Sequence, residues 1–205
     1  MALDSYTNLK LALANWTGRS DLDSSGTADD GIDLFESWVN RELRVRSMLV
    51  KVTSPTLASG AITHPSDWLQ WKTLKNATSP YRIEIIADES LADILEQNYT
   101  GNPRYAVPGA TQTELYPVPT SITGLVAHYY GAITALSGSN ATNWLLTKFP
   151  DAYLYGTLLA MNSWARDDAQ TQKYGNAFDA VMRQIESESD DATFGGSTLQ
   201  IRNAR

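Results

Sequence analysis

The stretch Pro150–Ala165, PDAYLYGTLLAMNSWA, decides the fold of the second half of this chain. Pro150 suits the first position of a helix because its missing N–H would have no partner there, and Asp151 places a negative charge at the same end. Leu154 and Leu158 recur at helical spacing, and aromatic or small residues occupy the other sides. The sequence therefore predicts a helix that is buried on most of its surface.

The prolines divide the rest of the chain. Seven of the eight lie between Pro55 and Pro119 and the eighth is Pro150, so residues 1–54 and 151–205 contain none. Proline interrupts both helix interiors and sheet ladders. This distribution predicts helical flanks around a centre that is rich in turns.

Apolar residues at helical spacing mark three further helices in the flanks. They are Tyr6, Leu9, Leu13 and Trp16, with Gly18 at the end; Ile32, Phe35, Val39 and Leu43; and Tyr174, Phe178, Val181 and Ile185. A short helical turn is expected over Asn143–Leu146, and the last helical pattern stops near Ser189.

The centre contains segments that are rich in β-branched and aromatic residues and bounded by Pro, Gly and Asn, which is typical of strands. These are Trp68–Leu74, Tyr81–Ile86, Thr113–Tyr116 and Ile122–Tyr130, and one helix is expected over Asp88–Tyr99. The predicted fold class is α+β: mainly an α-helical bundle built from both chain ends, with a β-rich central insertion and an extended C-terminal tail. The corresponding parts are residues 1–49, 50–136, 137–190 and 191–205.

The charge and composition exclude several classes of function. The chain has 16 Lys plus Arg against 23 Asp plus Glu, a net charge of −7, so it is a poor candidate for wrapping duplex DNA, although it could surround DNA without gripping it. It contains no cysteine, which excludes disulfides, thiol nucleophiles and Cys-based metal sites. We expect a soluble protein made inside the cell, because neither a signal peptide nor a membrane span is visible.

The sequence shows no recognisable active site, metal site or cofactor site. The two histidines, His64 before Pro65 and His128 in a predicted strand, lie near no nucleophile motif, and both are expected to be structural or exposed. Asp21 and Asp23 begin a loop like those that bind calcium, but the position that needs a bidentate Glu is Ile32. We expect this loop to be a solvated helix cap.

One dense basic group lies near the end of the second predicted helix: Arg41, Arg44 and Arg46. It admits two interpretations: compensation of the helix dipole with salt bridges inside the chain, or contact with a partner subunit. The many Tyr and Trp residues and a short tail that cannot fold alone favour an assembly component.

Three alternatives remain open at this point. A hydrolase needs paired carboxylates, and Glu84 and Glu114 alternate with apolar neighbours as ordinary outward-facing strand residues do. A carbohydrate-binding domain needs an exposed row of aromatic rings, but Trp68 and Trp71 would point to opposite faces of a regular strand. An assembly protein that forms a ring of some other kind is the third.

Several segments in order resemble the head-to-tail adaptor (connector) proteins of tailed bacteriophages. They are Trp16, Arg19–Leu22 (RSDL), Val39–Arg46 (VNRELRVR), Gly101–Tyr105 (GNPRY), Tyr116–Pro119 (YPVP), Tyr129-Tyr130, Ala135–Leu146 (ALSGSNATNWLL) and Pro150–Leu158 (PDAYLYGTL). The matches run from about residue 5 to residue 188, and one departure is the longer, more acidic link Ser24–Asp30.

The resemblance implies a virion protein, made in the bacterial cytoplasm, that forms a ring, usually of twelve copies, beneath the portal protein. Such a ring extends the DNA channel, retains packaged double-stranded DNA and docks tail, nozzle or tail-tube proteins, with no catalytic residue, cofactor or membrane. The alternative that stays open beside this family is another ring-forming neck or tail-completion protein. In this family the C-terminal segment commonly reaches the portal. Its candidate docking residues here are Phe194, Leu199, Ile201, Arg202 and Arg205.

We further expect acidic residues to face the channel, because they would repel the phosphates of passing DNA. The candidates form two clusters, one of Asp21, Asp23, Asp29 and Asp30 and one of Glu186, Glu188, Asp190 and Asp191.

Overall fold

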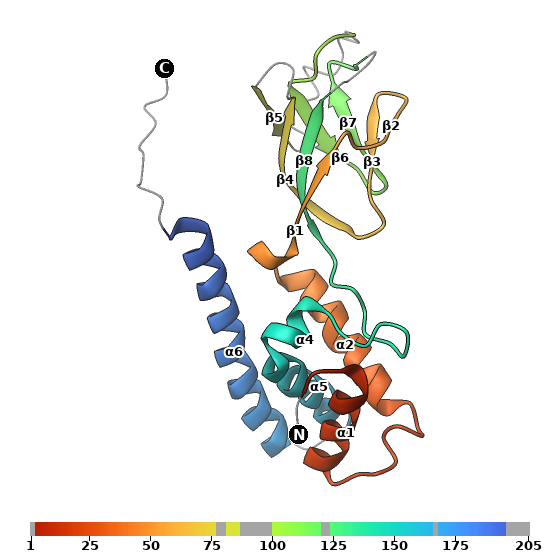
Figure 1. Ribbon diagram of the computed structural model, residues 1–205, viewed down its shortest axis with the longest axis vertical. Helices are drawn as coiled ribbons and strands as arrows, with labels where there is room; N and C mark the ends of the chain where they lie inside the picture. Colours follow the sequence, from red (N-terminus) through yellow and green to blue (C-terminus); the bar gives the residue numbers. More distant parts are fainter. Residues whose placement is uncertain (1–2, 77–80, 87–99, 120–123, 166–167, 196–205) are drawn as a thin grey trace. The chain divides into compact units, whose positions relative to one another are not determined.

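The computed structural model describes residues 3–76, 81–86, 100–119, 124–165 and 168–195 (Figure 1). The chain divides into two compact units. The helical unit comprises residues 1–47 and 133–205, and the sheet unit comprises residues 48–132. The chain therefore leaves the helical unit once, builds the sheet unit and returns.

The helical unit begins with α1 (Tyr6–Thr17) and α2 (Thr27–Glu42). The side chain of Ser5 caps α1 by accepting a hydrogen bond from the amide of Asn8, and Gly18 ends it in the left-handed conformation, with φ of 66°. Helix α2 has acidic residues in its first turn and Arg41 in its last, which is the polarity that the helix dipole favours. Both predicted helices are confirmed.

The second flank forms α4 (Trp144–Lys148), α5 (Pro150–Ala165) and α6 (Asp168–Phe194). Helix α5 lies against α2 so closely that a Cβ at Gly156 would lie 2.3 Å from Cδ2 of Phe35. The Phe35 ring in turn contacts Tyr153 of α5 and Phe178 of α6 edge-on, with centroids 4.9 Å and 5.8 Å away. The predicted burial of α5 is confirmed. No helix in the described ranges is both long and apolar enough to cross a membrane.

Two side chains of α2 hold the segment that returns from the sheet unit. The amide of Ile133 donates to Oδ1 of Asn40, and the amide of Leu136 donates to Oε1 of Glu36, each at 2.9 Å. The hydroxyl of Tyr153 donates to the same Glu36 oxygen at 2.8 Å. Burial raises the pKa of Glu36, although these two donors lower it in part.

The chain passes from the helical unit into the sheet unit within the 3₁₀ turn η1 (Arg46–Met48). The sheet unit contains an eight-stranded sheet of order β1-β8-β4-β5-β6-β7-β3-β2. The strands are β1 (Leu49–Thr53), β2 (Leu57–Ala58), β3 (Ala61–Thr63), β4 (Trp68–Asn76), β5 (Tyr81–Ile85), β6 (Tyr105–Pro108), β7 (Gln112–Tyr116) and β8 (Leu125–Gly131). All neighbouring strands run antiparallel except β5 and β6, which are parallel.

The sheet encloses a core of its own. Along β8, Leu125, Ala127 and Tyr129 are buried, and the residues between them are only partly buried. The buried side of β8 packs with apolar residues from the other strands: Ile62, Trp71, Leu74, Ile83, Ala106 and Leu115. Alternation with a period of two thus gives this strand one inner and one outer face.

The predicted fold class is wrong in one respect. We expected a mainly helical bundle with a β-rich insertion, but the sheet, with its eight strands and separate core, is a major element of an α+β fold. Strands β1, β2, β3 and β6 were not predicted as separate strands: β1 lies in the proline-free segment assigned to the helical flank, and β2, β3 and β6 are two to four residues long. So short a segment shows too little alternation to be told from a turn, and its partners are distant in sequence.

The end of the chain also differs from the prediction. Helix α6 continues to Phe194, so residues 191–194 are helical although the apolar pattern stops near Ser189. The helix expected over Asp88–Tyr99 lies outside the described residues.

Candidate functional site

The structure does not use the three arginines near the end of α2 as one group. Arg41 is exposed in the last turn of α2. Nη1 of Arg44 folds back and donates to the carbonyl oxygens of Asn40 and Leu43, at 2.9 Å and 2.6 Å. Arg44 therefore satisfies carbonyls at the end of its own helix, as the dipole interpretation expects.

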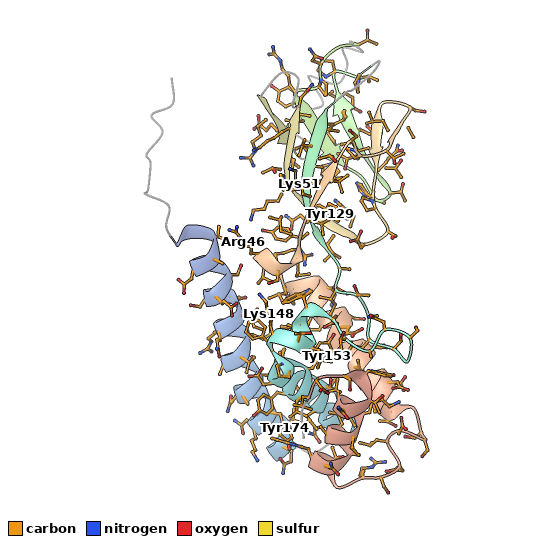
Figure 2. The ribbon with its side chains drawn as sticks, in the orientation of Figure 1. Arg46, Lys51, Tyr129, Lys148, Tyr153 and Tyr174 are labelled. Atoms are coloured by element: carbon orange, nitrogen blue, oxygen red, sulfur yellow. The ribbon has the colours of Figure 1, made fainter. Side chains whose placement is uncertain are left out.

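Arg46 binds the last turns of α6, which lie beside it in Figure 2. Its backbone N–H donates to Oγ of Ser189 at 2.9 Å, and its Nη1 donates to the carbonyl of Ala192 at 2.6 Å. Lys148 approaches Glu188 of the same helix to 3.9 Å. Helix α6 has no basic residue in its last turn, so Arg46 supplies the missing positive charge from another part of the chain.

The acidic residues Glu186, Glu188, Asp190 and Asp191 are all exposed on the last turns of α6. Negative charge near a helix C-terminus opposes the helix dipole. We call these four residues the acidic end of α6.

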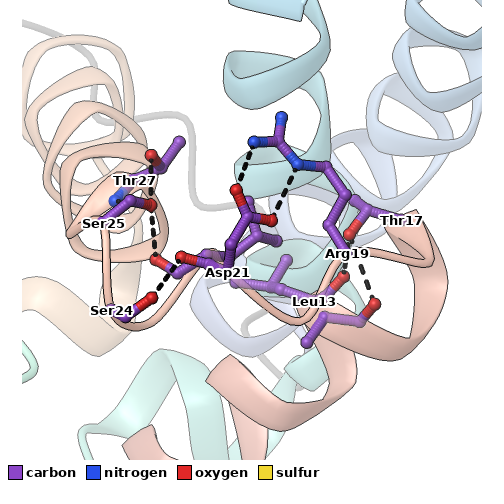
Figure 3. Close-up of polar contacts among 9 residues, drawn as sticks. Leu13, Thr17, Arg19, Asp21, Ser24, Ser25 and Thr27 are labelled. Atoms are coloured by element: carbon purple, nitrogen blue, oxygen red, sulfur yellow. Dashed lines mark hydrogen bonds and ion pairs between the residues drawn. The ribbon is translucent and has the colours of Figure 1, made fainter.

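The other acidic cluster, in the loop between α1 and α2, is partly neutralised. Nε and Nη2 of Arg19 donate to the two carboxylate oxygens of Asp21, at 3.1 Å and 2.7 Å (Figure 3). Lys10 pairs with Asp23 and also with Asp29, 2.8 Å from Oδ1 of the latter. Asp30 is exposed, so the cluster keeps a net negative charge at the surface.

The pKa values in this loop follow these contacts. The hydrogen bond from Arg19 lowers the pKa of Asp21. Burial opposes ionisation of Asp29, but the hydrogen bonds from Lys10 and Tyr6 outweigh it and lower the pKa. For Tyr6, burial and the bond to Asp29 raise the pKa to about 12. Within the described ranges no three His, Cys, Asp or Glu side chains group as metal ligands would.

A groove of about 710 Å³ lies along α1 beside this loop, lined by Tyr6, Lys10, Leu11, Ala14 and Asp23 among others. Leu11 is 47% exposed. Trp16 is 49% exposed even though its ring contacts Tyr155 and Tyr174, and Leu34 on α2 is 61% exposed. Leu11 and Trp16 on α1 and Leu34 on α2 thus leave apolar surface exposed.

Most of the predicted docking tail lies outside the described residues. Phe194 is the last residue of α6. The other four candidates, Leu199, Ile201, Arg202 and Arg205, lie outside the described residues.

Comparison with known families identifies the chain. The family model described as SU10 adaptor protein matches residues 4–202, which include nearly all of both units. The chain belongs to this family of phage adaptor proteins. The resemblance to head-to-tail adaptors is thereby confirmed, and the adaptor is a bacteriophage virion protein of the neck and its assembly. No curated protein matches the adaptor.

The two tryptophans of β4 do not lie on opposite sides of the adaptor's sheet as predicted. The register shift between Trp68 and Gln70 puts both indoles on one side of the strand, with ring centroids 5.8 Å apart. The His64 ring stacks on the Trp68 ring, with centroids 3.7 Å apart. A bulge adds a residue and so reverses the alternation. Trp71 is only 5% exposed, so the pair forms no exposed row for a sugar.

Sequence reasoning missed a basic surface on the adaptor's sheet. Lys51 of β1 pairs with His128 of β8, and Lys75 of β4 pairs with Val126, two residues earlier on β8, so both lysines share the outer face with His128. Lys72 reaches the same face, with its Nζ 5.4 Å from the centroid of the Tyr130 ring. The lysines are separated in sequence, and only the pairing of β1 and β4 on either side of β8 brings them together.

Proposed function

We propose that the adaptor assembles into a ring of twelve copies beneath the portal protein at the neck of the virion. The ring extends the DNA channel, retains packaged double-stranded DNA and docks tail, nozzle or tail-tube proteins. The observation that carries this proposal is the family match over residues 4–202. The proposed function contains no catalytic step, cofactor or membrane contact, and the protein is made in the host cytoplasm.

The charge of the chain supports passage of DNA without specific binding. Twelve copies of a chain with net charge −7 carry −84 formal charges, which repel phosphates from the channel wall. We assign the channel surface to the cluster of Asp21, Asp23, Asp29 and Asp30, which is partly exposed and only partly neutralised by Lys10 and Arg19. The exposed Arg41 is the member of the basic group that we assign to a neighbouring copy.

The C-terminal segment is the proposed contact with the portal. Arg46 holds the end of α6, so the segment after Phe194 starts from an anchored helix. The segment contains Leu199, Ile201, Arg202 and Arg205, which offer apolar and positively charged groups to a partner. A short segment of this kind can order when it binds.

The test is the mass of the adaptor alone and with its portal protein. We expect a ring of twelve adaptors on the portal, and wild-type adaptor that never exceeds a monomer with or without portal would contradict the proposal. Deleting residues 196–205, which leaves α6 complete, should weaken attachment and leave the far-UV circular dichroism unchanged.

A matched pair of variants tests the tail side chains. Leu199→Ser with Ile201→Ser should reproduce the loss seen on deletion, and Gln200→Ala with Asn203→Ala should not. If the truncated adaptor binds the portal as tightly as the full chain, the tail assignment is wrong.

A further inference from the structure

The outer face of strands β1, β8 and β4 concentrates positive charge in an acidic protein. Lys51 and Lys75 are exposed there, on either side of β8, and Lys72 lies over the Tyr130 ring. These three strands contain no Asp or Glu. We call Lys51, Lys72 and Lys75 with His128 the basic sheet face.

The crowding of like charges affects the imidazole of His128. Burial lowers the pKa of this imidazole, and the positive charges of Lys75, Lys51 and Lys72 lower it further. Positive charges gathered on one face of a sheet repel one another, and solvent screens only part of this repulsion. The basic sheet face is therefore unfavourable in an isolated copy, and an anionic surface placed against it would relieve the repulsion.

The same chain presents such a surface on its helical unit. The acidic end of α6 places four exposed carboxylates, Glu186, Glu188, Asp190 and Asp191, at the helix terminus that disfavours them. Arg46 bonds Ser189 and Ala192 of these turns rather than a carboxylate, and Lys148 approaches the carboxylate of Glu188.

We propose that the basic sheet face of one adaptor binds the acidic end of α6 of a second adaptor. This rests on the proposed ring, because a contact between two different surfaces repeats around a closed rotation to form one. Every copy carries both surfaces, so they are present in equal numbers. The net charge of −7 repels DNA at long range, which makes phosphate the less favoured ligand for three lysines.

Two charge reversals test the contact. The first variant, here called the face variant, carries Lys51→Glu, Lys72→Glu and Lys75→Glu. The second, the helix variant, carries Lys in place of Glu186, Glu188, Asp190 and Asp191. Alone, each should lower the fraction of adaptor in rings on the portal by about tenfold or more, because like charges then oppose each other between copies.

An equimolar mixture of the two variants should restore the ring. In an alternating ring the reversed face of one variant meets the reversed helix of the other, and the two remaining native surfaces also meet. A contact inside one chain could not be rescued by mixing. Lys173→Glu with Arg183→Glu, which reverses exposed charges elsewhere on α6, serves as the control and should leave the ring unchanged.

Other results would overturn the inference. Rings that form equally well with either variant would refute it while leaving the proposed function intact, whereas failure of the wild type to form rings would refute the proposed function. If the face variant forms rings as wild type does but no longer binds a fluorescent DNA duplex, the basic sheet face contacts DNA instead of a second adaptor. If both variants lose rings and mixing them does not restore the rings, the proposed contact is also refuted. Far-UV circular dichroism shows whether each variant folds.

Discussion

Replacing Tyr153 with phenylalanine would remove one hydroxyl from the centre of the helical unit. This hydroxyl donates to Oε1 of Glu36 at 2.8 Å and accepts from Nδ2 of Asn143 at 2.5 Å. The Tyr153 side chain is fully buried and Glu36 is only 4% exposed, so water cannot replace the lost donor. A hydrogen bond to a charged group contributes about 1.5–3 kcal/mol, and we expect Tyr153→Phe to lower the free energy of unfolding by that amount.

The assay is urea denaturation followed by far-UV circular dichroism, with hydrogen exchange at the amide of Leu136. That amide shares the Glu36 oxygen with Tyr153, so its protection reports on the same site. Tyr155→Phe, on the same helix but partly exposed, is the control and should cost less than about 0.5 kcal/mol. Equal costs for the two substitutions would refute the reasoning.

Glu36→Gln adds a pH test of the same network. Burial raises the pKa of Glu36 above its ordinary value of 4.5, so at intermediate pH the folded chain keeps a proton that the unfolded chain has lost. The stability contributed by Glu36 is therefore complete below 4.5 and falls as pH rises through the folded pKa. As pH rises through the folded pKa of Glu36, the Glu36→Gln variant should become more stable relative to wild type. Tyr153→Phe should lower the free energy of unfolding by less in the Glu36→Gln variant than in wild type. If the losses from Glu36→Gln and Tyr153→Phe add up in the double variant to within about 0.5 kcal/mol, the two side chains are not coupled and the reasoning fails.

Two further predictions concern packing and protonation. Gly156→Ala should destabilise the helical unit by about 1–3 kcal/mol in thermal melts, because its Cβ would lie 2.3 Å from the Phe35 ring, whereas Gly138→Ala, with no atom within 4 Å, should change little. Burial lowers the pKa values of His64 and His128 below 6.5, so the unfolded chain takes up protons first and the sheet unit should lose stability as pH falls through that value. Urea unfolding followed by tryptophan fluorescence at about pH 7.5 and about pH 5.5 measures the loss of stability between the two pH values. Replacing both histidines with glutamine should make this loss smaller. If the loss stays the same, the histidines do not cause it.

The helices could be predicted because their signals are local. The residues that bury one face of α1 recur every three or four positions, and the Ser5 and Gly18 caps lie next to the helix that they bound. The close contact between Gly156 and Phe35 had no such signal, because it joins residues 121 positions apart on two helices.

The candidate surfaces were predicted in part. The arginine group was visible as a sequence cluster, but its members separate: Arg44 bonds its own helix, and Arg46 bonds α6, more than 140 positions away. The position of Arg46 also explains why α6 continues past Ser189, where the apolar pattern ends. The acidic clusters were found because their members are neighbours in sequence, although their partial neutralisation by Lys10 and Arg19 was not.

The amino-acid sequence by itself determined the helices, the acidic character of the chain and its membership in a family of phage adaptors, since these depend on local spacing, composition and ordered motifs. Tertiary structure alone decided the size of the sheet, the side on which Trp68 and Trp71 meet, and the gathering of Lys51, Lys72 and Lys75 around His128. The physical reason is that strand partners and register depend on pairing between distant segments, and a single bulge reverses which side chains face the core.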